Sequence, residues 1–333
     1  MLQASQHDSF VSNRIIHFLE ALERRSNLAD ALYTSRPWNP MEGDRMEFSI
    51  GALSAVAGTV SERQRIPVVN WAQSLSIVRR QLQYGQAFEI TDRMKRFNKA
   101  YDADFMAREA AKGINDGWDY DLTHAIFSLS ENATYSHRSE GAGYDISCVD
   151  GKAPAATDHT VVGTGATQYS NRVNGATGLA LSTDNYVTVK EAPNVSAVDE
   201  YGTPMRSEYN DLVIAQNEDM RRKGRQIHGS PKEPEVFENA INIYADGSQR
   251  LVILPHATTD ESLAYDADLR YRWLLKSSQL QHLNQYSVAK EAGIKLESVD
   301  ENNLAARVVA DQYSAVGIVS WQDKFYSTTT EAP

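Results

Sequence analysis

Three ionisable residues lie close together near the middle of the chain and are the first candidates for chemistry. Asp119, Asp121 and His124 fall within one and a half turns of a predicted helix. Asp121 and His124 are three residues apart, so their side chains share a helix face, where a carboxylate and an imidazole can bind a metal ion. A solvated polar helix face explains the same residues more simply. We therefore predict an exposed face here and no metal site.

Three glycine-rich segments contain parts of the loops that bind phosphate groups. They begin at Gly141 (GAGYD), Gly163 (GTGATQ) and Gly175 (GATG). None completes GxGxxG or GxxxxGK[ST], and none lies between a clear strand and a clear helix, as those motifs require. We therefore predict no nucleotide and no other cofactor.

The remaining nucleophiles and bases form no recognisable catalytic set. The histidines show no HExxH spacing, and no GxSxG sequence is present. The single cysteine, Cys148, excludes internal disulfides and cysteine-based zinc clusters. His256 follows Pro255 at a predicted strand end, a position that catalytic and structural histidines share. We therefore predict no catalytic residues and a protein that is not an enzyme.

Composition and charge limit the class of protein. The chain has 333 residues, of which 41% are hydrophobic and 23% charged, as in ordinary folded proteins. The first ten residues, MLQASQHDSF, lack the basic and apolar regions of a secretory signal, so we expect a protein made and kept in a cytoplasm. A net charge of −11 argues against tight binding of nucleic acid by phosphate neutralisation. It is compatible with a protein that lines a container of DNA.

A long amphipathic helix is predicted over residues 98–130. Steps of three and four residues between apolar positions place them on one helix face. Strict heptads are not kept, and Gly113 and Gly117 lie inside the segment, so a coiled coil is not expected. A spine helix lying across a sheet suits this pattern. Its apolar positions are Ala103, Ala107, Ala111, Ile114, Trp118, Leu122, Ala125 and Leu129.

Two segments before this helix show apolar faces without an evident local core. Residues 10–32 form an amphipathic helix pattern that ends at the sequence SRPWNPMEG. Met46, Phe48 and Ile50 then alternate with polar residues, and residues 74–83 alternate again, as in strands. We predict a two-stranded excursion whose apolar face, like that of the arm, is covered by neighbouring subunits. An ordinary core sheet remains the alternative.

The later segments alternate between strands and helices. Residues 131–177 are predicted to form loops and short strands, and residues 178–192 a helix that ends before Pro193. An apolar strand over residues 211–215 precedes a polar helix over residues 217–226. Residues 245–248 spell a hairpin turn, and residues 271–275 form another strand. Residues 304–321 alternate as a last strand that returns beside the spine helix.

This order of parts resembles the major capsid proteins of tailed double-stranded DNA bacteriophages, whose shell fold is shared with encapsulins. The likeness lies mainly in MEGDRMEFSI, in PVVNWAQSLSIVRRQLQYGQAFEITD and in AARVVADQYSAVGIVSW. The resemblance implies an α+β phage capsid shell fold. It divides the chain into an N-terminal arm (1–42), an extended β-hairpin loop (43–90), a peripheral domain with the long spine helix (91–162), an axial domain (163–299) and a return strand of the peripheral domain (300–333).

The resemblance also implies a structural function. Copies of the chain would assemble into hexamers and pentamers of an icosahedral head that encloses phage double-stranded DNA without sequence specificity. Scaffold, portal and decoration proteins would be separate partners, and the chain would reside in the virion after assembly in the host bacterial cytoplasm. Some relatives join subunits through a lysine of the extended loop and an asparagine. The first lysine here is Lys95, so that bond is not expected.

Five charged residues of the extended loop are predicted intersubunit contacts on this resemblance. Replacing Arg63 and Arg65 by Glu should weaken shell assembly while the subunit still folds. Two alternatives remain: an encapsulin-like compartment with protein cargo, and a cytoplasmic α/β enzyme with a scattered site. The five contacts are Arg45, Glu47, Glu62, Arg63 and Arg65.

Overall fold

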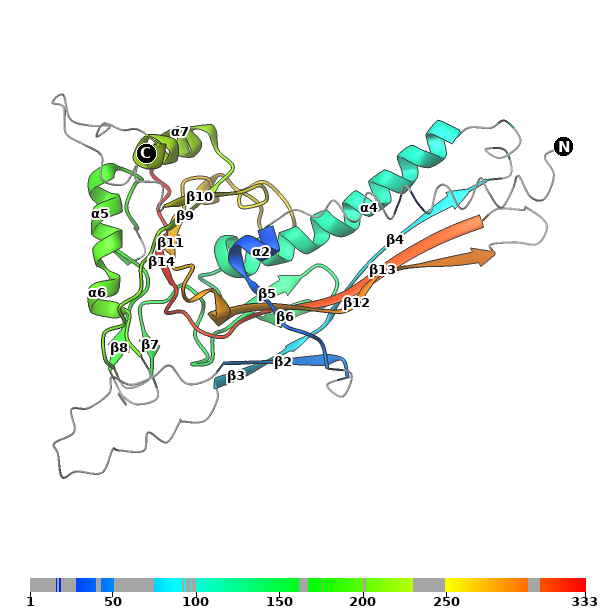
Figure 1. Cartoon of the computed structure of the whole chain (residues 1–333). Coiled ribbons are helices and arrows are strands. Elements are labelled where there is room, and N and C mark those ends of the chain that lie inside the picture. Colours follow the sequence, from blue (N-terminus) through cyan, green and yellow to red (C-terminus); the bar gives the residue numbers. More distant parts are fainter. Residues whose placement is uncertain are drawn as a thin grey trace.

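Two four-stranded sheets and one long helix organise the structure, a computed structural model (Figure 1). The first sheet, here the long sheet, extends with the helix to one side of the molecule. The second, here the short sheet, lies at the other end beside several shorter helices. The structure describes residues 16, 18, 28–39, 43–50, 75–91, 93, 97, 100–161, 167–175, 177–199, 202–229, 249–298 and 306–333.

The long sheet has the strand order β1-β12-β13-β4. Its centre is β13, which pairs antiparallel with both β12 and β4. The predicted last strand is therefore confirmed, and it lies beside the spine helix because that helix packs on β4 and β13. The strands are β1 (Thr34–Ser35), β4 (Leu82–Ile90), β12 (Asn284–Ser298) and β13 (Ala306–Ile318).

The spine helix is confirmed as α4 (Ala100–Thr123), which continues into a π-helical turn, η2 (His124–Ser128). The buried side of α4 includes Ala107, Ile114 and Trp118, in one cluster with apolar residues of the long sheet. The amide of Leu129 donates to the carbonyl of His124 over 3.0 Å, which closes the wider turn. The helix thus forms a one-faced cover on the long sheet.

The polar residues near the end of this helix are buried, so the prediction of a solvated face is wrong there. Asp119, Asp121 and His124 are 7%, 2% and 1% exposed. The β5–β6 hairpin and the segment after Leu254 supply contacts to Asp121 and His124. Spacing within the helix gives no information about such distant segments. The hairpin strands are β5 (Thr134–His137) and β6 (Gly141–Asp145).

The short sheet has the strand order β10-β9-β11-β14. Alternate residues of β9 belong to two different apolar clusters: Leu212 and Ile214 to the one with α5 and α7, Val213 and Ala215 to the main core. A strand covered on both faces needs apolar residues throughout, which explains the continuous run that predicted this strand. Its strands are β9 (Asp211–Ala215), β10 (Arg250–Leu254), β11 (Trp273–Lys276) and β14 (Lys324–Ser327).

Helices lie beside the short sheet (Figure 1). The expected helix before Pro193 is present as α5 (Thr183–Glu191), with Ser182 accepting the amide of Asn185 as its N-cap. Pro193 begins the next helix, α6 (Pro193–Ser196), because a proline lacking an amide proton is tolerated at a first helical position. The predicted polar helix is α7 (Glu218–Gly229), which connects the parallel strands β9 and β10.

Strand pairing differs from the proposed division of the chain at three places. Strand β4, within the segment assigned to the extended loop, pairs with β13 in the long sheet. Strand β12, within the segment assigned to the axial domain, pairs with β13 in the long sheet. Strand β14, within the segment assigned to the return strand, pairs with β11 in the short sheet. The chain therefore crosses between the two sheets after β11 and again after β13. The predicted turn at residues 245–248 lies outside the described residues.

The two strands of the expected excursion form an antiparallel ribbon, β2 (Arg45–Ile50) with β3 (Leu75–Arg80). The ribbon's distal residues, 51–74, lie outside the described residues. The apolar side chains of β2 are buried, and they cluster with Leu280, Leu283 and Val319 of the same chain. For the described ribbon, the prediction that neighbours cover this apolar face is therefore wrong. The turn after β11 and the end of β13 supply the missing apolar surface.

The end of the N-terminal arm is likewise covered by its own chain, although Ile16 is 50% exposed. Helix α2 (Leu28–Leu32) buries Leu28 and Leu32 in the main core. The Tyr33 hydroxyl donates to the Leu122 carbonyl of the spine helix over 2.6 Å. The predicted helix spans residues 10–32. Of its residues before α2, 16 and 18 are described, and the others lie outside the described residues. The end of the arm is thus anchored to the body of the subunit.

Residues 131–177 contain short strands and turns, as predicted. Besides the β5–β6 hairpin, strand β7 (His159–Thr160) pairs with β8 (Gln168–Tyr169). Short 3-10 turns occur later in the chain, η5 (Ala267–Leu269) and η6 (Gln281–Leu283). Among the described helices, none combines the length and the apolar character needed to cross a bilayer.

Candidate subunit interface and buried junction

The outer face of the β2–β3 ribbon carries charged side chains. Strand alternation turns Arg45 and Glu47 away from the buried Met46 and Phe48, and both are exposed. Arg45 lies opposite Arg80 of β3 in the register, so two cations share one end of this face. Glu62, Arg63 and Arg65 lie outside the described residues. The intersubunit role of all five residues stays a prediction.

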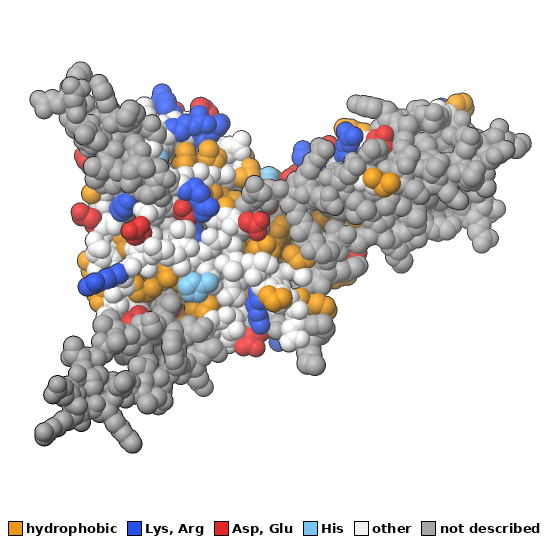
Figure 2. Space-filling view, viewed as in Figure 1, with side chains coloured by type: hydrophobic (Ala, Val, Ile, Leu, Met, Phe, Trp, Pro, Cys, Tyr) orange, Lys and Arg blue, Asp and Glu red, His pale blue; other side chains and the backbone are white. Residues whose placement is uncertain are grey.

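A groove separates this ribbon from the β5–β6 hairpin. Val78, 52% exposed, contributes an apolar side chain to its wall. Figure 2 shows the mixed charged and apolar character of one face of the molecule. A surface of this kind suits contact with another protein and holds no set of reactive groups. The lining residues are Arg45, Val78, Arg79, Arg80, Glu140, Ala142, Gly143, Tyr144 and Asp145.

Two adjacent arginines of the ribbon have different environments. Arg79 is 4% exposed; its Nη1 lies 3.0 Å from Asp145 Oδ2, and its Nη2 donates to the Ser147 carbonyl. Arg80 is exposed, and its Nη1 lies 2.8 Å from Glu140 Oε2. Buried, well-bonded charges fix structure, whereas exposed pairs contribute little stability. Arg79 therefore holds the ribbon on the β5–β6 hairpin. The exposed Arg80 can leave Glu140 and pair with an acidic side chain of another protein.

The carboxylate of Asp121 is enclosed by donors at the end of α4. Arg138 donates to its two oxygens, each over 2.9 Å, and the Tyr84 hydroxyl donates over 2.6 Å. His137 Nδ1 accepts the Ser139 amide, so Nε2 carries the proton and donates to Asp121 over 3.1 Å. Burial by itself raises the pKa of Asp121, but the His137 hydrogen bond and the Arg138 charge hold it below its ordinary value.

His124 lies beside this cluster without taking part in it. Its Nε2 is 3.1 Å from Thr259 Oγ1, whose hydroxyl donates to the His256 carbonyl, so Nε2 donates to Thr259. Burial lowers the pKa of His124 to about 4, so the imidazole is neutral near pH 7. Within the described ranges, no group of three or more histidine, cysteine or acidic side chains is placed to hold a metal ion.

A second histidine has the partner that catalytic histidines have. His159 Nδ1 lies 2.8 Å from Asp150 Oδ2, and its ring stacks on Trp321 with centroids 4.6 Å apart. Its Nε2 is buried and has no hydrogen-bond partner among the described residues. Nucleophilic catalysis requires a hydroxyl or thiol within hydrogen-bond reach of that nitrogen. The pair therefore serves packing around Trp321.

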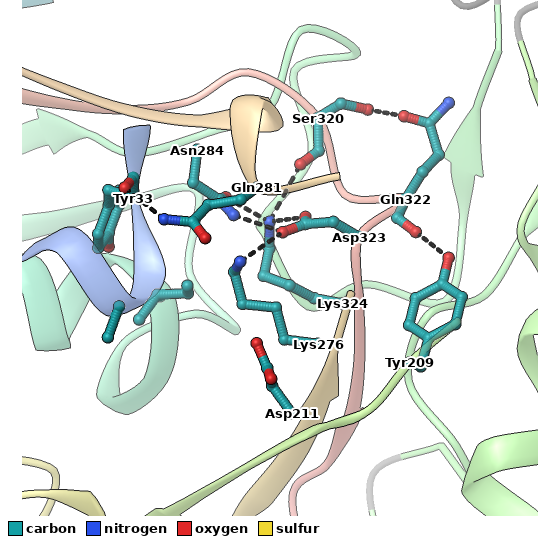
Figure 3. Close-up of polar contacts among 12 residues, drawn as sticks. Tyr33, Tyr209, Asp211, Lys276, Gln281, Asn284, Ser320, Gln322, Asp323 and Lys324 are labelled. Carbon is teal, nitrogen blue, oxygen red and sulfur yellow. Dashed lines mark hydrogen bonds and ion pairs between the residues drawn. The ribbon is translucent and has the colours of Figure 1, made fainter. Parts of the chain in front are cut away.

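A cluster of fully buried ionic side chains lies where the two sheets meet (Figure 3). Lys324 Nζ is 2.6 Å from Asn284 Oδ1 and 3.1 Å from the Ser320 carbonyl oxygen. Asp323 accepts hydrogen bonds from both Lys324 Nζ and Asn284 Nδ2. Lys276 Nζ lies 3.8 Å from Asp323 Oδ2. This buried junction, made of Lys276, Asn284, Asp323 and Lys324, joins β11, β12 and β14.

The charges of the buried junction do not balance. Two lysines face one aspartate, and the neighbouring Asp211 is already paired with Arg250 over 2.7 Å. Burial, together with the charge of Lys324, lowers the pKa of Lys276 to about 8, although Asp323 opposes this. Sequence reasoning missed the cluster. Its signal in the sequence is a lysine that ends the apolar run WLLK and an adjacent aspartate and lysine within SWQDKFY.

Comparison with known proteins identifies the fold. No family model and no curated protein matches the chain. Among solved structures, it is similar to the capsid of an empty GTA particle, with 11% identity, 91% of this chain and 89% of that chain covered, and a TM-score of 0.51.

Two further solved structures are similar to the chain. One is the procapsid of bacteriophage JBD30, with 12% identity, 98% of this chain and 76% of that chain covered, and a TM-score of 0.49. The other is a virus-like particle from Pyrococcus furiosus, with 9% identity, 93% of this chain and 96% of that chain covered, and a TM-score of 0.49. The likeness to the GTA capsid shows that the chain has the α+β capsid shell fold.

Proposed function

We propose that this chain is a major capsid protein, a structural subunit that assembles with copies of itself into hexamers and pentamers of an icosahedral phage head. The observation that carries this proposal is the fold shared with the capsid of the GTA particle over about nine-tenths of both chains. Elements predicted for a capsid subunit, namely the spine helix, a two-stranded ribbon before it and the last strand beside it, occur in the expected order.

The outer face of the ribbon supports assembly through charged contacts. Arg45 and Arg80 lie opposite each other at its exposed end, beside the apolar Val78. A neighbouring copy can offer acidic side chains to this end, since the chain carries 44 acidic against 33 basic residues. Charge complementarity of this kind sets the register of subunits more than it adds affinity. The ribbon is thus proposed to guide one subunit onto the next.

The proposed head encloses double-stranded DNA without sequence specificity and is assembled in the host bacterial cytoplasm. Scaffold, portal and decoration proteins are separate partners in this proposal. The polar clusters support a structural role, because Asp121 is fully bonded to protein donors and His159 faces no nucleophile within the described part of the chain. No step of catalysis is assigned to the chain.

Electron microscopy of the purified full-length chain tests the proposal. We expect closed particles with fivefold and sixfold clusters of subunits. In particles recovered from the producing host, we expect DNA that is protected from added nuclease. An enclosed enzyme in place of DNA would instead support a compartment with protein cargo. Subunits that remain monomeric at every concentration and salt condition would contradict a shell function.

A further inference from the structure

The buried junction places an amine, a carboxamide and a carboxylate in contact, away from water. Lys324, Asn284 and Asp323 are fully buried (Figure 3). Lys324 Nζ lies 2.6 Å from Asn284 Oδ1, so it is at most about 3.8 Å from the carbonyl carbon, close to the ~3–3.5 Å of a near-attack geometry. The amine is therefore placed beside an electrophilic carbon at a site closed to bulk solvent.

The carboxylate of Asp323 connects the two groups that would exchange protons. It accepts from Lys324 Nζ and also from Asn284 Nδ2. A carboxylate in both hydrogen bonds can take a proton from the ammonium group and deliver one to the departing nitrogen. Asp323 thus has the position of a general base and general acid for this pair.

The surplus charge of the cluster gives the reaction a physical driving force. Two buried ammonium groups share one carboxylate, and Lys276 Nζ has no hydrogen-bond partner among the described residues. A buried charge without a hydrogen bond, sharing its counter-ion with a second cation, is costly. Converting Lys324 to a neutral amide would leave one cation, Lys276, facing one anion, Asp323, at the 3.8 Å that already separates them.

We propose that Lys324 and Asn284 of the same chain become joined by an isopeptide bond, with Asp323 carrying the proton. Lys324 passes a proton to Asp323, and the free amine forms a bond to Asn284 Cγ. The bond from Cγ to Nδ2 then breaks as Asp323 returns the proton to Nδ2. The departing nitrogen also takes the surplus proton of the attacking amine, so one ammonium ion leaves and Asp323 is again a carboxylate.

The proposed bond would lock the two sheets of one subunit together. Asn284 is the first residue of β12 in the long sheet, and Lys324 is the first residue of β14 in the short sheet. The bond lies within one subunit and involves no residue of the 43–90 segment. It is therefore independent of whether the chain assembles into shells, and its failure would leave the proposed function untouched.

Mass spectrometry of the purified, denatured full-length chain tests the proposal directly. We expect the mass of the sequence less one ammonia molecule, about 17 Da. Because a succinimide at Asn284 would lose the same mass, tryptic peptides must locate the change. We expect no cleavage at Lys324 and a branched peptide that joins residues 277–290 to residues 308–333. An unchanged mass, or a branch through Lys276, would overturn the assignment.

Substitutions distinguish the residues that take part in the proposed reaction from residues that only lie beside them. Asn284→Ala and Lys324→Arg should abolish the branched peptide, and Asp323→Asn should slow its formation about 100-fold, as loss of general acid–base catalysis does. Ser320→Ala is the matched control in the same cluster, because its hydroxyl bonds to Gln322 and not to the reacting groups, and its carbonyl is kept. It should form the bond as the unaltered chain does. Equal loss in Ser320→Ala and Asp323→Asn would overturn the role of Asp323.

Discussion

In the β2–β3 ribbon, the apolar side chains of β2 face the subunit body, and Arg45 and Arg80 face solvent beside Val78. At the end of helix α4, by contrast, the Asp121 carboxylate is enclosed by donors from other segments. Arg80 is 61% exposed, while Asp121 is 2% exposed. Exposed ion pairs contribute little to folding, but breaking a buried one leaves an uncompensated charge. The helix end therefore determines whether a subunit folds, and the outer ribbon face remains available for neighbouring copies.

The largest effect is expected at the helix end. Asp121→Ala removes the acceptor of Arg138, His137 and Tyr84, which leaves a half-buried guanidinium without its carboxylate. We expect a loss of about 3–5 kcal/mol in the free energy of unfolding. Chemical denaturation of the isolated subunit measures it. Glu109→Ala, at an exposed position of the same helix, is the matched control and should change stability by less than about 0.5 kcal/mol.

The inner face of the ribbon should be nearly as sensitive. Phe48→Ala empties a buried position that packs against Gly317 of β13, where a side chain would collide with the ring. We expect a loss of about 3–4 kcal/mol in the free energy of unfolding. Val78→Ala, on the outer face, should cost less than about 1 kcal/mol. Similar losses for the two variants would show that the inner face is not packed on the subunit.

Acid should weaken the helix end through His124. The pKa of this histidine is about 4 in the folded chain against about 6.5 when unfolded, so between these values the unfolded chain binds more protons. Stability should therefore fall by about 2–3 kcal/mol as the pH drops from 6.5 to 4. His124→Gln should reduce this slope, and His282→Gln, at an exposed position, should keep it. An equal slope in both variants would contradict the assignment.

The smallest effect on folding is expected at the outer ribbon face. There we expect the clearest difference between an unchanged subunit stability and a lost ability to form particles. Replacing Arg45 and Arg80 by Glu should change subunit stability by less than about 1 kcal/mol, because both side chains are exposed. The same double variant should form few particles, since it reverses the charge offered to the neighbour. Light scattering during assembly measures this. Normal assembly of a normally folded double variant would refute the role of this face.

Much of the fold was predictable where the apolar pattern was simple. The continuous run of β9 and the alternation in β13 identified both strands. Strand β4 was only partly recognised, because Gly85 and its two successors interrupt the alternation with three exposed positions. Strand β12 was missed because its sequence, NQYSVAKEAGIKLES, is largely polar. Strand β4 is specified by pairing with β13, which lies far away in sequence, whereas β12 pairs with the same strand as its immediate successor along the chain.

The polar clusters could not be predicted, because their partners are distant in the chain. Asp121 bonds to Tyr84, which precedes it by 37 positions, and to Arg138, which follows it by 17 positions. Within the helix, the spacing of Asp121 and His124 indicated only that they share a face. In the same way, Asn284 and Lys324 meet although they lie 40 positions apart in the chain. The sequence showed which groups exist, and the fold decided which of them touch.

Sedimentation velocity of the purified full-length chain tests the central claim most directly. The account predicts that the folded subunit shifts into large particles of uniform size as protein concentration rises, and that the Arg45 and Arg80 double variant stays small under the same conditions. A folded chain that sediments as a compact monomer over the whole concentration range would contradict the claim that this is a shell subunit.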